Sequence, residues 1–260
     1  MKLLQSWGLG VALCVFFIVE ARGDEYLWEK QDTAWVLSRN GQDVGRLLPE
    51  SQPSLATEDR IEKLGPGVFR MTRVVRNNQE TVLKSARLTL DFVHAETAAF
   101  LMIPSVSYNG NHWGRGKEPK GFQHEGTWWS FSSRRTPIPG ATYSEGTRWA
   151  VALWGEVTAE MPVLSCSLMP ENGRVTHRLI WPEEEMPLVY SGRDDYQPGT
   201  RENLDLGPGQ ALTCSAILVV DEVKPGHRAM ATFLSRDWEM LAKKKEASRS
   251  GEDMWDLAVR

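Results

Sequence analysis

The sequence predicts a mainly β protein, an antiparallel β-sandwich followed by C-terminal linker helices. Short runs of β-branched and aromatic residues recur along the chain, and Gly, Pro and Asn separate them. In the longest run, Leu83–Val93, mostly polar residues alternate with apolar ones, and this period of two is typical of a strand. Helical spacing of apolar residues is almost absent before Pro225.

Nine strands are expected in chain order. They are Ala34–Leu37, Val68–Arg76, Leu83–Val93, Ala99–Val106, Trp128–Ser132, Arg148–Trp154, Val163–Leu168, His177–Trp181 and Gln210–Val220. In Leu83–Val93, the apolar residues Ala86, Leu88, Leu90 and Phe92 alternate with Arg87, Thr89, Asp91 and Val93. This alternation predicts a strand with one face on the core and the other in water.

The C-terminal part is expected to be helical. Apolar residues recur at three- and four-residue steps through Ala231–Lys245, which indicates one amphipathic helix. A short linker precedes Ser250–Asp253, which resembles a capping box, and a second apolar face begins at Met254. So short a helix needs a packing partner. Either it docks on the sheets, or the chain is the front part of a longer polypeptide.

The first 23 residues are typical of a secretory signal peptide. Lys2 supplies a positive charge, Leu9–Val19 is an apolar run, and Ala21-Arg22-Gly23 fits cleavage after Gly23. The alternative is a retained membrane anchor, but the run is shorter than the roughly 20 residues that span a bilayer. We therefore expect a secreted or periplasmic protein without a membrane partner, with a sandwich at 24–224 and helices at 225–260.

Charge and cysteine content exclude some classes of function. The chain has a formal net charge of −4, and loss of residues 1–23 makes it −5, so we expect no nucleic-acid partner. No cysteine and histidine spacing resembles a zinc site, and no metal or cofactor is expected. Cys166 and Cys214 lie in apolar runs on the parity of the core. They could pair or remain free, since sequence gives no distance between them.

A loop at 107–117 suggests ligand binding. It combines glycines, amides and aromatic rings, a set that suits neutral polyhydroxyl ligands because amides pair with hydroxyls and rings stack on sugars. The candidate binding residues are Tyr108, Asn109, Asn111, His112, Trp113, Trp128, Trp129, Tyr143 and Glu145. We expect the rings to form a rim at one edge of the sandwich. The alternative is a loop folded back on itself, with Trp113 as its own hydrophobic plug.

A second segment, 133–146, is expected beside this loop. Two prolines stiffen it, and Arg134, Arg135 and Glu145 could hydrogen-bond a ligand. The alternative is an Arg–Glu pair that pins the loop.

At these residues the sequence resembles a known family, the N-terminal β-supersandwich (galactose-mutarotase-like) domain of bacterial exported six-hairpin, or (α/α)-toroid, glycosidase-like proteins. The resemblance rests on Ile103-Pro104, on the run from Tyr108 to Gly114, and on the run from Pro139 to Glu145. The segments Ala231–Lys245 and Asp253–Leu257 look similar to the linker helix and first toroid helix of such proteins.

The resemblance implies a carbohydrate-facing accessory domain that lends a loop to the sugar site of a glycoside-hydrolase-like protein. Its partners would be an oligo- or polysaccharide and the C-terminal toroid, which this sequence does not contain. Two catalytic carboxylates would be expected mostly from that toroid, and nothing marks Glu125, Glu145, Asp194 or Asp195 as acid or base. Whether the chain is an enzyme is left open, and this portion is not expected to catalyse alone.

Three other functions stay open. The first is a stand-alone glycan-binding module. The second is a mutarotase-like sugar epimerase, for which His112, His124 and His177 are the candidate acids or bases. The third is a structural domain whose aromatic residues simply form the core.

Overall fold

The computed structural model describes residues 26–108, 122–192 and 195–223. The expected signal peptide, residues 109–121 of the expected binding loop and the expected C-terminal helices lie outside these residues.

The described chain is almost entirely strands. They are β1 (Tyr26–Gln31), β2 (Ala34–Arg39), β3 (Gln42–Leu47), β4 (Leu55–Gly65), β5 (Val68–Asn77), β6 (Leu88–His94), β7 (Phe100–Ile103), β8 (Ser107–Tyr108), β9 (Gln123–His124), β10 (Thr127–Trp128), β11 (Phe131–Ser132), β12 (Thr142–Glu145), β13 (Trp149–Glu156), β14 (Ser165–Glu171), β15 (Arg174–Trp181), β16 (Glu184–Gly192), β17 (Asp195–Arg201) and β18 (Ala211–Glu222). A 3₁₀ turn, η1 (Ser133–Arg135), follows β11.

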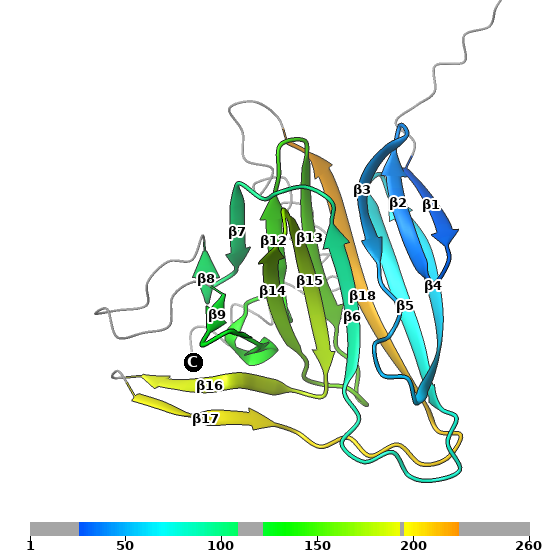
Figure 1. The fold of residues 1–260 in the computed structure, drawn as a ribbon, viewed down its shortest axis with the longest axis vertical. Helices are drawn as coiled ribbons and strands as arrows, with labels where there is room; N and C mark the ends of the chain where they lie inside the picture. The colour runs from blue at the N-terminus through cyan, green and yellow to red at the C-terminus, as the bar shows by residue number, and fades with distance from the viewer. Residues whose placement is uncertain (1–25, 109–121, 193–194, 224–260) are drawn as a thin grey trace, which may run out of the picture.

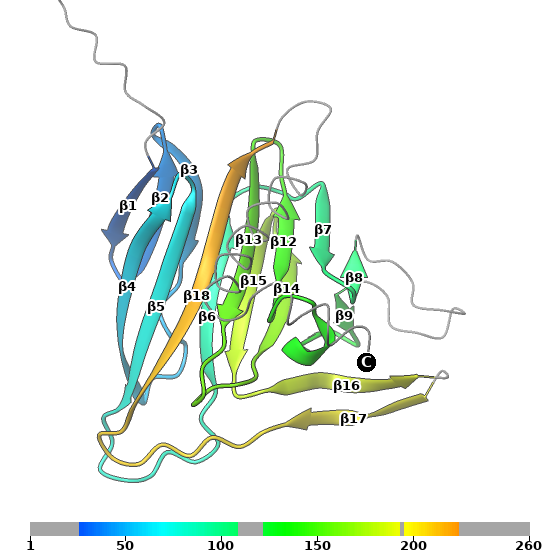
Figure 2. The same cartoon turned by 180° about the vertical axis from the view of Figure 1, so that it is seen from behind.

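Two seven-stranded antiparallel sheets form the sandwich (Figures 1 and 2). The first sheet has the order β1-β2-β3-β6-β15-β14-β11, and the second has the order β4-β5-β18-β13-β12-β7-β8. Two hairpins, β9-β10 and β16-β17, stand outside both sheets. In both views the β16-β17 hairpin lies on the far side of the molecule from β1.

The main core lies between the two sheets and follows the alternation of the strands. On β6, Leu90 and Phe92 face Phe69 and Met71 of β5, and all four are at most 1 % exposed. Trp28 packs edge-to-face on Phe69 and Phe92, with ring centroids 5.7 and 6.2 Å apart. Such contacts add roughly 1 kcal/mol to the burial of each ring. A smaller apolar cluster covers the outer face of the second sheet, where Ala150, Ala152 and Trp154 of β13 point away from the main core.

The predicted β-sandwich is confirmed, and each of the nine expected strands overlaps an observed one. Trp128–Ser132 is split between β10 and β11, however, and the expected water-exposed face of Leu83–Val93 is wrong. Thr89 and Asp91 are 3 % and 6 % exposed although they point away from the main core. They are buried because they have polar partners: Glu50 accepts hydrogen bonds from Thr89, and Asp91 binds Arg178 at 2.6 Å.

The two cysteines of the described chain are free and buried. Burial raises the pKa of the Cys166 thiol to about 12. Burial also raises the pKa of Cys214 to about 12, against the opposing charge of Arg73. Of the two outcomes that the sequence allowed, the structure has free thiols.

Candidate functional site

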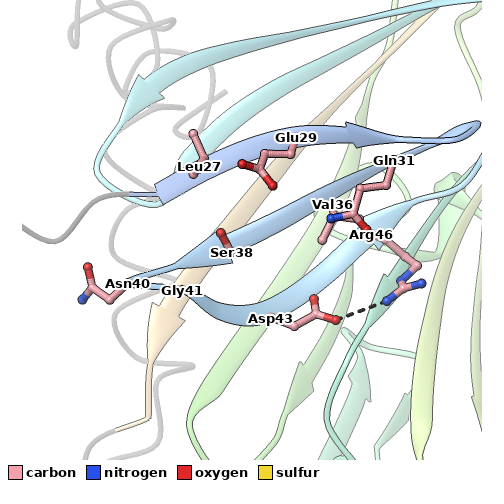
Figure 3. A pocket seen from close by; sticks show the side chains of 9 residues that line it. All are labelled: Leu27, Glu29, Gln31, Val36, Ser38, Asn40, Gly41, Asp43 and Arg46. Carbon is pink, nitrogen blue, oxygen red and sulfur yellow. Dashed lines mark hydrogen bonds and ion pairs between the residues drawn. The ribbon is translucent and has the colours of Figure 1, made fainter.

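A hollow of about 490 Å³ lies on the outer face of the first three strands. We call it the first hollow; its lining residues are Leu27, Glu29, Gln31, Val36, Ser38, Asn40, Gly41, Asp43 and Arg46 (Figure 3). Alternation explains why the lining is mostly polar. Tyr26 and Trp28 of β1 pack against the core, so the alternate residues Leu27, Glu29 and Gln31 face outward. None of the nine lining residues is aromatic.

A turn and a bulge give the first hollow its shape. Asn40 and Gly41, with φ of 52° and 77°, form the two-residue turn that joins β2 to β3, a conformation that suits an Asn-Gly pair. The pairing of β2 with β3 then skips Val44, since Leu37 pairs with Gly45 and Ser38 pairs with Asp43. This bulge places Asp43 and Arg46 on the same face although they are three residues apart. They form an ion pair of 3.2 Å (Figure 3).

The strand packing beneath the first hollow is tight. A Cβ atom at Gly45 would come within 2.6 Å of the Phe92 ring, so only glycine fits where β3 crosses this ring. The bulge therefore rests on a rigid base.

Three polar side chains of the first hollow are free. Glu29, Gln31 and Ser38 make no side-chain hydrogen bond or ion pair with the part of the chain that the structure describes. Together they offer a carboxylate, an amide and a hydroxyl, that is, acceptors and donors for a hydroxylated ligand. The exposed Leu27 and the half-buried Val36 add apolar surface beside them.

A second hollow of about 470 Å³ lies at the opposite edge of the first sheet, between η1 and the β16-β17 hairpin. Its lining residues are Ser132, Arg134, Arg135, Glu183, Glu185, Thr200, Arg201 and Glu202. The charged groups here bind one another. Arg134 pairs with Glu183 at 3.0 Å, and Arg135 makes two contacts with Glu185.

Glu184 anchors the second hollow from beneath. It is 2 % exposed and binds Arg87 at 2.7 Å and Arg201 at 2.9 Å. Burial disfavours its charged form, yet the hydrogen bond and charge of Arg87 and the charge of Arg201 hold the pKa of Glu184 below its ordinary value. Arg134 and Arg135 therefore attach the loop after β11 to Glu183, which directly precedes β16, and to Glu185 of β16. Glu145 is not their partner.

The expected binding residues are only partly within the described chain. Asn109, Asn111, His112 and Trp113 lie outside it, and Tyr108 is placed only as part of β8. Trp128 is half-buried against the main core, and Trp129 is 5 % exposed and stacked on Phe131 with a centroid distance of 5.7 Å. The expected rim as a whole stays a prediction, but Trp129 belongs to the core.

Tyr143 and Glu145 lie together on the outer face of the second sheet. The Tyr143 hydroxyl donates to Glu145 Oε2 at 2.8 Å, and Phe100 packs edge-to-face on the Tyr143 ring. Tyr143 is 1 % exposed and Glu145 is 9 % exposed, so neither is open to a ligand in this structure. Among the other carboxylates considered, Glu125 is exposed in the β9-β10 turn, Asp194 lies outside the described chain, and Asp195 begins β17.

Of the three histidines considered as acid or base, His112 lies outside the described residues, and His124 and His177 are not exposed. His124 is half-buried beside the Trp129 ring. His177 is buried between the sheets, where its ring nitrogens contact Thr142 Oγ1 at 2.9 Å and Ser144 Oγ at 2.7 Å. His94 reaches the same Ser144 hydroxyl at 2.8 Å through Nδ1, and its Nε2 has no partner among the described residues. We call the four side chains of His94, Thr142, Ser144 and His177 the interior polar layer.

The interior polar layer is uncharged at neutral pH. Burial lowers the pKa of His94 to about 4, against the charges of Glu96 and Asp43. Burial, together with the charge of His94, lowers the pKa of His177 well below its ordinary value. Both histidines are 0 % exposed, so neither ring is open to a ligand in this structure.

Residues 26–108, 122–192 and 195–223 hold no group of three or more His, Cys, Asp or Glu side chains suited to a metal ion. The same residues contain no helix long and apolar enough to cross a membrane.

Comparisons with known proteins found fold likeness at low similarity. No protein-family model matches the chain, and the curated proteins gave no significant match. Among solved structures, a proposed aldose 1-epimerase from Escherichia coli K12 aligns with 12% identity and a TM-score of 0.35, over 76% of this chain and 69% of that one. The Slr1438 protein from Synechocystis sp. PCC 6803 aligns with 8% identity and a TM-score of 0.38, over 77% of this chain and 96% of that one.

Proposed function

We propose that this domain is a non-catalytic carbohydrate-binding module that holds a glycan in the first hollow. The observation that carries the proposal is the set of three free polar side chains, Glu29, Gln31 and Ser38, on the neighbouring strands β1 and β2 beside exposed apolar surface. A sugar presents hydroxyl groups around a ring with apolar C–H faces. Its hydroxyls can replace the water at these side chains, and its C–H groups can contact Leu27 and Val36.

The expected affinity is low. No aromatic ring lines the first hollow, so the stacking that usually strengthens sugar binding is missing there. Hydrogen bonds exchanged with water contribute only about 1 kcal/mol each. We therefore expect dissociation constants from the millimolar to the high-micromolar range.

The geometry favours binding over sugar epimerisation. A mutarotase-like reaction needs an acid and a base that both reach the sugar. The first hollow offers the carboxylates Glu29 and Asp43 but no histidine, and Asp43 is paired with Arg46.

In its wider form, the proposal is that the domain is exported and acts beside a glycoside-hydrolase-like catalytic domain, to which it lends the loop at 107–117. The signal-peptide pattern and the family resemblance support this form. N-terminal sequencing of the protein recovered from the periplasm or medium tests the export. The expected first residue is Asp24, and a mature protein that keeps Met1 would contradict it.

The binding proposal is tested by NMR titration of the full mature chain with a panel of neutral oligosaccharides. We expect shifts of the β1 and β2 amides, and at least a fivefold loss of affinity in the double variant Gln31→Ala/Ser38→Ala. Thr200→Ala in the second hollow is the matched control and should bind normally. Trp113→Ala tests the loop at 107–117 separately. Failure of every glycan to bind, or equal affinity in the double variant, would overturn the proposal for the first hollow.

A further inference from the structure

The charge balance of the first hollow is uneven. Its nine lining residues include two carboxylates, Glu29 and Asp43, and one cation, Arg46. Arg46 is committed to Asp43 through the pair of 3.2 Å, so these two charges offset each other. The Glu29 carboxylate remains as an uncompensated negative charge, because it makes no ion pair within the described chain.

The nearest side chains to Glu29 on this face carry no charge: Val36 is apolar, and Ser38 and Gln31 are hydrogen-bonding groups. Glu29 pairs across the strands with Val36, and Leu27 pairs with Ser38, so Ser38 is the diagonal neighbour of Glu29. Diagonal neighbours lie roughly 7–8 Å apart, and Gln31 lies roughly 7 Å from Glu29 along β1. A single sugar residue above Glu29 can thus reach the hydroxyl on one side and the amide on the other.

We infer that the first hollow selects glycans that carry a protonated amino group, with Glu29 as the residue that sets this preference. The inference rests on the proposed function and names its ligand class. An ammonium group donates three hydrogen bonds and carries a positive charge that can pair with the Glu29 carboxylate. A uronic acid or a sulfated sugar brings a second negative charge to the same place, where Asp43 already offsets the charge of Arg46.

The preference should be modest, because the hollow is open to solvent. An exposed ion pair contributes about two- to fivefold in affinity, and salt screens it over roughly 8 Å at physiological ionic strength. The preference should therefore decrease when sodium chloride is raised.

The experiment compares three ligands on the full mature chain at low salt. They are glucosamine oligomers, the matched N-acetylglucosamine oligomers, whose nitrogen is uncharged, and oligogalacturonate. We expect the glucosamine oligomers to bind about two- to fivefold more tightly than the acetylated ones, with oligogalacturonate the weakest. In Glu29→Gln, which keeps the size of the side chain, the first two ligands should bind equally.

Glu80→Gln is the control for net charge. Glu80 is exposed, lies outside the first hollow and makes no ion pair within the described chain, so this variant should keep the preference. Equal binding of the charged and acetylated oligomers to the unmodified chain would overturn the inference and leave the proposed function intact. The same holds if the Glu29 and Glu80 variants lose the preference for glucosamine oligomers equally, or if oligogalacturonate binds more tightly than the glucosamine oligomers. If none of the three ligands or the neutral panel binds, both the inference and the proposed function fail.

Discussion

The two hollows at the opposite edges of the first sheet are almost equal in volume, about 490 and 470 Å³, and both are lined mainly by polar side chains. They differ in what those side chains already bind. In the second hollow and directly beneath it, arginines from three parts of the chain neutralise three consecutive glutamates, Glu183, Glu184 and Glu185. In the first hollow, only Asp43 and Arg46 form an ion pair.

This difference separates a structural ion network from a binding surface. A ligand that binds the charged groups of the second hollow must first displace an existing ion pair. A ligand that enters the first hollow displaces only water from Glu29, Gln31 and Ser38. Volume and polarity are alike in the two hollows, so the free hydrogen-bonding capacity is the property that distinguishes them.

The interior polar layer extends this comparison to polar groups that are buried from solvent. We expect its protonation to cause the largest change in stability. The pKa of His94 is about 4 in the folded chain, against an ordinary value of 6.5. Below pH 6.5 the unfolded chain therefore binds more protons at this residue than the folded chain does. The stability that neutral His94 confers is complete above pH 6.5 and is lost as the pH falls toward 4. The loss is about 3 kcal/mol for this residue, and His177 adds to it in the same direction.

Urea unfolding of the mature chain between pH 7.5 and 4.5 measures this loss. Paired carboxylates such as Glu184, whose pKa is lowered, act in a different window. Their contribution is present above the ordinary value of 4.5 and is lost below it, so the range above pH 5 isolates the histidines. A urea midpoint that stays constant from pH 7.5 to 5 would show that the layer takes up protons without cost.

The next largest effect is expected from Glu184→Ala at the second hollow. The variant removes the 2 % exposed carboxylate that Arg87 and Arg201 share. We expect a loss of about 2–3 kcal/mol in the free energy of unfolding, toward the lower end for buried pairs because both arginines are partly exposed. Glu29→Ala in the first hollow is the matched comparison and should change stability by less than about 0.5 kcal/mol. Equal losses in urea unfolding would remove the distinction between the two hollows.

The sequence predicted the sandwich because most strands carry the alternation of a half-buried sheet. Val68–Asn77 and Ala211–Glu222 differ from their expected ranges by at most two residues at either end. Leu55–Gly65 was missed because its middle is charged, with Glu58, Asp59, Arg60, Glu62 and Lys63 in an edge strand that solvent covers. The hairpin β16-β17 was missed because prolines and consecutive glutamates hide its alternation.

The candidate site was harder to predict than the fold. Glu29, Gln31 and Ser38 have the pattern of any solvent-facing strand position, and sequence does not tell a free side chain from a paired one. The Asn40-Gly41 pair could have indicated the hairpin, but not the bulge at Val44 that places Asp43 beside Arg46. Tyr143 and Trp129 were expected on a rim because they are aromatic, yet aromatic residues are also the usual content of a core, where both lie.

The smallest effect on stability, and the most direct test of the comparison, is expected from Asp43→Asn. The Asp43–Arg46 pair is partly exposed, with side-chain exposures of 43% and 35%, so its loss should change the free energy of unfolding by no more than about 0.5 kcal/mol. The variant keeps the shape of the first hollow but removes the negative charge that offsets Arg46. Oligogalacturonate should then bind about two- to fivefold more tightly than it binds the unmodified chain, and the advantage of glucosamine oligomers should shrink. Calorimetric or NMR titration of both ligands measures this change. Unchanged affinities in a stably folded Asp43→Asn variant would mean that pairing between side chains does not control what the first hollow accepts.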